Sequence, residues 1–515
     1  MKQPKTDSFV HELPLQLTPH DLATLDVRLD MARQLYNACL RESLRRVDIM
    51  RESKGYQTAR RLPKEIGGKP NLERRSAFKD CRDKHDVSAY SLHAFAASTR
   101  NACAIKNHLD VNTCQTIATR AFKAVIDYCV GRHGRPRFKR VGWLSSVEGK
   151  TNKQGIIWRD GLVKWSGLAL RPLFSQKDKY GVEAHALASQ VKYLRLIKRS
   201  FKGEARWSVQ VVLAGQPLAK GKSRATTNTV GLDIGPSTIA VVGNNEAMLQ
   251  QFCSGVINPR KEIRRVDRAI DRSRRACNPD NYNPGGTAKK GRRAWVKSSR
   301  YKKLQCRKAD LLRVMAATRK KEHGELANAI VRMGSDIRTE KLSYKSFQKN
   351  FGRSVRDRAP GMFVSLLRRK AEKAGGGVTD ISTRKTRLSQ TCLCGRVEKK
   401  PLKQRHHICT CGVAAQRDLF SAFLAMHCTS ETLDMRQANE SWSAAEPLLR
   451  RAMSRLSQTA KGRINPSSFG LSRRQSGLPV KDGSPLVEAV DAVVAGNSHE
   501  SHGETQTLAV RTLWF

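Results

Sequence analysis

Three acidic residues stand in separate motifs whose composition suits phosphodiester chemistry. They are Asp233 in Gly-Leu-Asp-Ile-Gly, Glu340 in Ile-Arg-Thr-Glu-Lys-Leu and Asp418 in Gln-Arg-Asp-Leu-Phe. Carboxylates that a fold brings into one pocket repel one another, so either the pKa of one rises or the group binds hard cations such as Mg2+. Cation binding is the outcome that suits cleavage of a nucleic-acid backbone. The pattern therefore predicts a divalent-metal nuclease.

Such a reaction uses two metal ions roughly 4 Å apart, one to lower the pKa of the attacking water and one to stabilise the departing oxygen. We expect Asp233 to bridge the two ions, because it lies on a predicted central strand. Glu340 and Asp418 are each expected to complete the coordination of one ion. Mg2+ is the expected ion, and Mn2+ can replace it in an oxygen site. Taken singly, such an acid is more often a helix cap or a turn former than a metal ligand, and only the joint arrangement favours catalysis.

A cysteine cluster between the second and third acids is a second candidate site. Two Cys-x-Cys-Gly knuckles are separated by 14 residues and resemble a structural zinc site, with Cys392, Cys394, Cys409 and Cys411 as ligands. Because each knuckle is one residue shorter than Cys-x-x-Cys, we expect strained ligand geometry, with His406 or His407 as alternative ligands. The other interpretation is a ribbon that no longer binds metal. The remaining nine of the 13 cysteines are scattered singly, which predicts free thiols in a reducing cytosol.

The charge balance identifies the class of partner. The chain has 96 Lys and Arg against 45 Asp and Glu, a formal net charge of +51 over 515 residues, which requires a polyanion. A reader of one short duplex site meets roughly 6 to 10 phosphates, whereas a guide paired with a target of about 20 base pairs presents several-fold more. No uncharged apolar run approaches the roughly 20 residues of a membrane-spanning helix. We therefore expect a cytoplasmic, nucleoid-associated protein of bacterial or archaeal type, with no membrane role.

The elements that must position these sites begin with a strand over residues 9–17 and a helix start at 18–21. Helical periodicity then dominates residues 19–135. After a basic turn segment, short β-rich segments in residues 136–227 are expected to close a small barrel with residues 1–18.

Strands alternate with helices around the three acids, which predicts an α/β unit built from residues 228–257, 321–387 and 413–455. Between its parts lie a strongly basic helical hairpin (258–320) and the cysteine ribbon (388–412). Residues 260–320 contain 21 basic and five acidic residues, and a merely solvated helix face would mix the two signs. The nearly neutral, Ser/Gly/Pro-rich residues 456–515 are expected to be a disordered tail.

These motifs together resemble a known family. The three acidic segments, with Ser-Gln-Thr-Cys opening the ribbon at residue 389, are similar to the three-part RuvC nuclease domain of TnpB proteins and compact type V CRISPR effectors. The segments Leu35–Asn37 and Gly134–Lys139 and the basic hairpin also look like this family. The resemblance covers roughly residues 9–440.

The resemblance implies an RNA-guided DNA endonuclease, encoded by a transposable element or by a CRISPR locus. It implies an RNase H-like RuvC core, a wedge barrel, a helical recognition domain at 19–135, a bridge-type hairpin and a zinc-ribbon target-nucleic-acid-binding domain. The implied partners are a guide RNA and a double-stranded DNA target with a short adjacent motif, bound by a monomer or a homodimer on RNA. Two positions depart from the family's usual Asp-Arg-Asp-x-Asn: Gln416 replaces the first Asp and Phe420 the Asn.

Three other functions remain open from the residues alone. A guide-independent DNA transposase uses a similar three-acid centre, and a non-catalytic nucleic-acid-binding regulator would share the basic charge. An actin-like ATPase would also place a strand-turn-strand around Asp233, but the net charge and the cysteine cluster speak against it.

Overall fold

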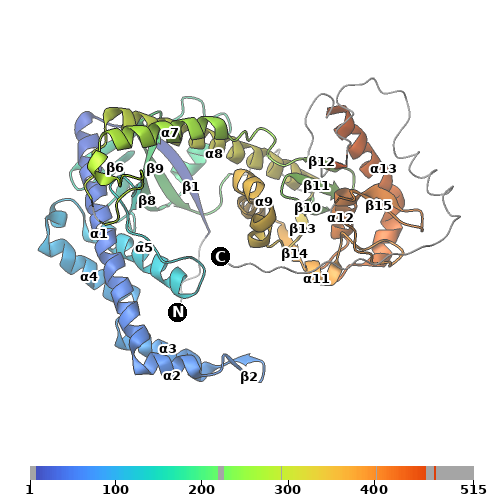
Figure 1. Ribbon diagram of the computed structural model, residues 1–515, viewed down its shortest axis with the longest axis horizontal. Helices are drawn as coiled ribbons and strands as arrows, with labels where there is room; N and C mark the ends of the chain where they lie inside the picture. The colour runs from blue at the N-terminus through green and yellow to red at the C-terminus, as the bar shows by residue number, and fades with distance from the viewer. Residues whose placement is uncertain (1–6, 219–225, 292, 402, 460–468, 471–515) are drawn as a thin grey trace. The chain divides into compact units, whose positions relative to one another are not determined.

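The computed structural model describes residues 7–218, 226–291, 293–401, 403–459 and 469–470. Contacts divide the chain into two units of mixed α/β structure, drawn in Figure 1. One unit contains residues 1–222 and 259–314, and the other contains residues 223–258 and 315–515. None of the helices in the described ranges combines the length and the apolar character that a membrane crossing requires.

The first unit is built on a seven-stranded sheet in the order β4-β8-β9-β1-β7-β6-β5. The strands are β1 (Ser8–Gln16), β4 (Ser146–Glu148), β5 (Ile157–Arg159), β6 (Leu162–Trp165), β7 (Leu168–Pro172), β8 (Val191–Phe201) and β9 (Glu204–Ala214). All neighbours are antiparallel. The strand ladder is open between β4 and β5, although β5 also contacts β8 because the sheet curls. The first strand of the chain therefore pairs with strands from the 136–227 segment.

Helices fill most of residues 19–135. They are α1 (Pro19–Glu52), α2 (Lys54–Arg61), α3 (Leu72–Lys84), α4 (Ala89–Ala102) and α5 (Val111–Cys129), with a short 3-10 turn at Ala104–Asn107. Thr18 and Asp21 form a capping box at the start of α1, as the sequence indicated. The segment differs from an all-helical insert by one small hairpin, β2 (Glu65–Ile66) with β3 (Lys69–Pro70). A further short helix, α6 (Val182–Ala188), precedes β8.

A buried arginine joins α1 to the sheet. The Arg28 guanidinium lies 4.7 Å from the ring centroid of Trp165 and donates to the Trp165 carbonyl at 2.7 Å. The Trp165 indole N–H in turn donates at 3.0 Å to Asp110, the N-cap residue of α5. A cation stacked on an aromatic face away from water contributes more than an exposed pair. This chain of contacts fixes α1 and α5 against β6.

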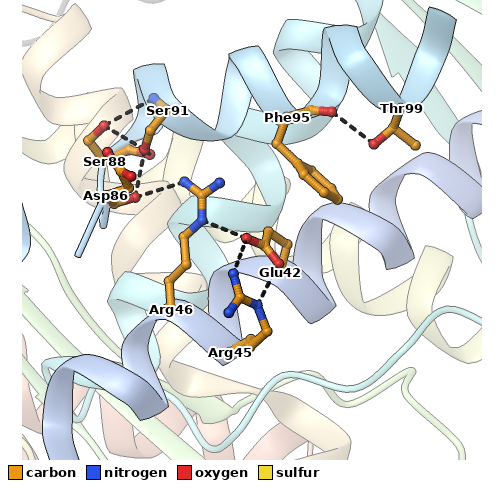
Figure 2. Close-up of polar contacts among 8 residues, drawn as sticks. All are labelled: Glu42, Arg45, Arg46, Asp86, Ser88, Ser91, Phe95 and Thr99. Carbon is orange, nitrogen blue, oxygen red and sulfur yellow. Dashed lines mark hydrogen bonds and ion pairs between the residues drawn. The ribbon is translucent and has the colours of Figure 1, made fainter. Parts of the chain in front are cut away.

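Glu42 of α1 belongs to a hydrogen-bond network that connects α1 to the start of α4. Figure 2 shows Glu42 accepting hydrogen bonds from Arg45 (2.8 Å) and Arg46 (2.8 Å), while Arg46 also donates to the Asp86 carbonyl (2.9 Å). That carbonyl also accepts from the Ser91 hydroxyl in the first turn of α4. Hydrogen bonding to Arg45 is the main reason why the pKa of Glu42 falls to about 2.

Replacing Glu42 tests this network through its pH dependence. Because the folded-state pKa lies below the ordinary value, the stabilisation is complete above about pH 4.5 and is lost as the pH falls through 2. Glu42→Gln is expected to cost about 1 kcal/mol at pH 7. The cost should shrink toward pH 3 in thermal melts followed by circular dichroism. The exposed Glu65→Gln serves as control, and an equal cost of Glu42→Gln at both pH values contradicts the assignment.

The second unit is a three-layer α/β/α sandwich. Its sheet has the order β12-β11-β10-β13-β14, from β10 (Thr229–Ile234), β11 (Thr238–Gly243), β12 (Ala247–Gln251), β13 (Asp336–Glu340) and β14 (Gly377–Ile381). The first three strands pair antiparallel, and β13 and β14 continue parallel to β10. The end of α8 and α10 (Pro360–Lys373) pack on one face, and α12 (Arg417–Met426) and α13 (Met435–Thr459) on the other. The segments around the acids therefore form one sheet.

Smaller elements complete this unit. These are α9 (Tyr344–Arg358), α11 (Thr383–Thr386) and a two-stranded ribbon of β15 (His406–Ile408) and β16 (Ala414–Gln416). Helix α13 runs to Thr459, so the predicted tail boundary at 456 falls inside a helix. Most of the predicted disordered tail, residues 460–468 and 471–515, lies outside the described residues.

The basic hairpin consists of α7 (Arg260–Ala276) and α8 (Ser299–Met333), joined by a loop that contains a 3-10 turn at Pro279–Asn281. The predicted end of the hairpin at residue 320 is not a structural boundary, because α8 continues without a break to Met333. The division between the two units falls within this helix, after Val314.

Glycine at position 231 permits the closest contact in the second unit. A Cβ there would overlap the backbone carbonyl of Ala422 in α12 and lie 2.8 Å from the Met426 nitrogen. Helix α12 thus rests directly on the backbone of β10, with no side chain between them. The absence of a side chain at Gly231 therefore determines the distance between α12 and the sheet.

Gly231→Ala is therefore expected to be strongly destabilising. The added methyl group forces α12 away from β10, and overpacking of this kind costs roughly 1–3 kcal/mol. We expect the thermal midpoint of the second unit to fall by several degrees. Gly324→Ala is the matched control, since its Cβ on α8 meets nothing within 4 Å and should stabilise the helix slightly. Equal melting curves for the two variants contradict the packing argument.

Candidate functional site

Strand register brings two of the three predicted acids side by side. In the parallel pair of β10 and β13, Leu232 is opposite Thr339, so the next residues, Asp233 and Glu340, are neighbours at the carboxyl ends of the strands. Leu232 belongs to the core on the α8 and α10 face. Because side chains alternate along a strand, Asp233 and Glu340 point to the opposite face, which α12 covers.

Helix α12 carries the third acid, Asp418, in its first turn. Gln416 is its N-cap, and the side-chain oxygen of Gln416 accepts the Leu419 N–H at 2.8 Å. At the other end, Arg338 of β13 donates to the Met426 carbonyl at 2.8 Å. Both ends of α12 are thus fixed. The family departure at Gln416 has a structural role here as a helix cap.

The three carboxylates influence one another electrostatically. Burial and the charges of Asp418 and Glu340 raise the pKa of Asp233 well above its usual range. Burial also raises the pKa of Glu340 and that of Asp418, whose side chain is 14% exposed. Such a group favours a bound cation or a bound proton. The ligand atoms of the acids are farther apart than those of the four cysteines described below. Among the described residues, only those cysteines form a group of potential ligand atoms that all lie within 4.8 Å of one another.

Two arginines lie beside the acids. The charges of Arg417 and Arg405 lower the pKa of Asp233 and of Asp418, and Arg417 Nε is 3.7 Å from an Asp418 oxygen. Burial lowers the pKa of Arg405 itself. Sequence analysis placed Arg417 in the third acidic motif, next to Asp418, but assigned neither arginine a role. Among 96 basic residues, no spacing signal distinguishes Arg405.

The donor set fits the predicted ion. Three carboxylates at the end of a sheet offer only oxygen ligands, the type that Mg2+ and Mn2+ prefer. Burial and the charges of Asp418 and Glu340 raise the pKa of Asp233 despite the two neighbouring arginines, so its negative charge is not fully compensated. A divalent cation would supply the missing compensation.

The four predicted cysteine ligands converge at one point. Their Sγ atoms all lie within 4.8 Å of one another. The Sγ atoms of Cys392 and Cys411 are 3.5 Å apart, and those of Cys394 and Cys409 are 3.7 Å apart. Tetrahedral zinc with Zn–S bonds of about 2.3 Å requires sulfur separations of about 3.8 Å. The cluster is thus compatible with a zinc ribbon.

The two knuckles have the same backbone geometry. The amide of Gly395 donates to the Cys392 carbonyl and that of Gly412 to the Cys409 carbonyl, each at 3.0 Å. Both glycines have a positive φ, +82° and +92°, which other residues rarely adopt. The shortened Cys-x-Cys spacing is accommodated by this repeated turn. The Cys392–Cys411 and Cys394–Cys409 separations are close to the tetrahedral value, and strain elsewhere in the knuckles stays a prediction.

The alternative histidine ligands lie outside the cluster. His407 is buried and stacks on Phe420 of α12, with ring centroids 4.4 Å apart, and burial lowers its pKa to about 4. His406 is part of β15, and no group of potential ligands in the described ranges includes it. Phe420, the second family departure, is thus a core residue that joins the ribbon to α12.

Zinc content tests the cysteine cluster directly. Purified protein is expected to contain about one zinc per chain by elemental analysis. Cys392→Ser and Cys409→Ser should each lower it toward zero, because three thiolates and a hydroxyl hold zinc less tightly. Cys428→Ser is the matched control, since this buried cysteine lies outside the cluster. Unchanged zinc in the two knuckle variants, or none in the wild type, contradicts the assignment.

Comparison with known proteins gives one family match. Residues 361–424 match the Cas12f1-like TNB domain, a stretch that contains all four cysteine ligands and Asp418. This confirms the resemblance to compact type V effectors. None of the curated proteins is significantly similar to the chain.

Two solved structures are similar over most of their length. A cryo-EM structure of a Cas12f1–sgRNA–target DNA complex has 11% sequence identity and a TM-score of 0.42, over 81% of this chain and 98% of that chain. A cryo-EM structure of a CRISPR–Cas12f ternary complex has 12% identity and a TM-score of 0.22, over 78% of this chain and 81% of that chain.

Proposed function

We propose that the chain is an RNA-guided DNA endonuclease that cuts DNA at a single RuvC-type site formed by Asp233, Glu340 and Asp418. The observation that carries the proposal is the convergence of Glu340 and Asp418 on the buried Asp233, whose pKa their charges raise, at the carboxyl ends of β10 and β13. The match of residues 361–424 to a Cas12f1-like domain supports the same conclusion. Three unrelated helix caps or turns would not place two carboxylates close enough to raise the pKa of a third.

The chain's residues would act by holding and orienting. Asp233 on the central strand β10, Glu340 and Asp418 would hold the ions. When bound, two Mg2+ ions supply an activated water and stabilise the departing oxygen. Arg405 and Arg417 lower the pKa of Asp233 and Asp418 and would add positive charge where a backbone phosphate approaches. The capped helix α12 preserves the spacing between Asp418 and the strand acids.

The partners that we assign are a guide RNA and a double-stranded DNA target beside a short motif. The net charge of +51 supports a partner that presents many phosphates. The hairpin of α7 and α8 has the densest positive charge, with 21 basic residues between positions 260 and 320. We assign the seven-stranded sheet to a wedge domain, α1–α5 to a recognition domain and the ribbon to target binding. Base pairing by the RNA would then supply the sequence information.

Substitution of each acid tests the proposal. Asp233→Ala, Glu340→Ala and Asp418→Ala are each expected to reduce DNA cleavage in Mg2+ by at least a hundredfold, because each removes ligand oxygens needed in the transition state. RNA and DNA binding in electrophoretic shifts should change little. Asp380→Ala is the matched control: it lies at the end of β14, where its carboxylate pairs with Arg368. Full cleavage by an acid variant removes that residue from the site.

The RNA requirement separates this function from its rivals. A defined RNA should copurify with the protein, and cleavage should need it. Cleavage or joining of DNA ends without RNA would indicate a transposase instead. Tight binding with no products in Mg2+ or Mn2+ would indicate a non-catalytic regulator.

A further inference from the structure

Two sequence segments that the nuclease proposal does not use meet in the first unit. Asn37 of α1 holds the backbone of Lys139 with two hydrogen bonds: its side-chain amide donates to the Lys139 carbonyl at 2.9 Å, and its oxygen accepts the Lys139 N–H at 2.8 Å. Arg33 donates to the same carbonyl at 3.4 Å. Asn37 thus satisfies both the N–H and the carbonyl of Lys139, as a neighbouring strand would. These bonds fix the centre of the 134–143 loop to α1.

This 134–143 loop exposes large apolar side chains although its backbone is anchored. Phe138 is 55% exposed, Val141 76% and Trp143 66%. The next residue, Leu144, is buried in the core and fixes the end of the loop. Exposed aromatic residues on an anchored backbone lose little conformational freedom when a partner covers them. The loop has the properties of a prepared contact surface.

The charges on the loop identify the partner. It contains four basic residues, Arg135, Arg137, Lys139 and Arg140, and no acidic residue. The Arg140 guanidinium lies 5.5 Å from the ring centroid of Trp143, and Arg135 pairs with Asp48 at 3.1 Å. An apolar protein surface would match the rings but not this density of positive charge. Nucleic acid matches both, since phosphates pair with arginines and bases stack on rings.

We infer that the 134–143 loop is a stacking platform for unpaired nucleotides, with Phe138 and Trp143 against bases and Arg137 and Arg140 against phosphates. Bases within a duplex are already stacked, so only an unpaired stretch offers faces to these rings. The inference rests on the nucleic-acid binding in the proposed function, but not on catalysis. An unpaired stretch of RNA and a displaced DNA strand share the chemistry that the loop would recognise.

Binding of short oligonucleotides tests the platform. The probes are fluorescein-labelled 20-nucleotide poly(U), 20-nucleotide poly(dT) and a 20-base-pair DNA duplex, titrated with full-length protein over a range of salt concentrations. Phe138→Ala combined with Trp143→Ala should weaken single-strand binding roughly tenfold or more with an unchanged salt slope. Arg137→Ala combined with Arg140→Ala should lower the salt slope by about 1 to 2. Duplex affinity should change less than single-strand affinity in the aromatic variant.

A matched control is Tyr90→Ala, an aromatic residue on α4 that is 84% exposed but lies outside the loop. It should bind all three probes like the wild type. Equal affinity of the aromatic double variant and the wild type overturns the inference, as does an equal loss in Tyr90→Ala. A larger loss on poly(U) assigns the platform to RNA, and a larger loss on poly(dT) assigns it to DNA. If the wild-type protein binds these probes but does not cleave DNA under any condition, the proposed nuclease function is contradicted and the inference about the loop still holds.

Discussion

The direct contact between α12 and the backbone of β10 at Gly231 is the constraint on which the second unit depends. A helix that rests on a strand without an intervening side chain has one height and little freedom to slide. Two residues further along β10, the same face carries Asp233, and α12 begins with Asp418 in its first turn. Because Gly231 has no side chain, α12 lies close to β10 and Asp418 is held near Asp233. Arg338 and Gln416 keep the helix ends in place around that contact.

The elements around the acids could be predicted because their local signals agree with their tertiary roles. Strand β13 and α10 both lie in the segment 321–387, where strands and helices were predicted to alternate. Helix α10 has apolar residues at helical spacing, with Phe363 and Leu367 buried, and glycines follow its end. Helix α9 was not predicted because it is polar and interrupted at Phe351, where the backbone is non-helical. Strand β14 was missed because it begins in a run of glycines, and its pairing with β13 is a long-range interaction.

The candidate site was predictable in type and less so in detail. Acid identities and cysteine ligands could be chosen from motifs, whereas the contribution of Arg405 depends on the ribbon folding back toward α12, which no local pattern encodes. The expectation of strain in the short knuckles rested on spacing alone. Spacing fixes the number of residues between thiolates, but the positive φ of Gly395 and Gly412 decides how the turn closes. Backbone conformation of this kind is set by hydrogen bonds within the folded ribbon.

The cysteine ribbon leads without a spacer into the acidic centre. Strand β16 ends at Gln416, which caps α12, and Asp418 follows two residues later. If zinc fills the cluster, an ion that takes no part in the reaction fixes the position of Asp418. Oxidation of the thiols would then disturb the proposed nuclease centre while leaving the positively charged surfaces unchanged. Under the proposed function, zinc-free protein would bind its target without cleaving it, so zinc supply would decide whether binding leads to cleavage.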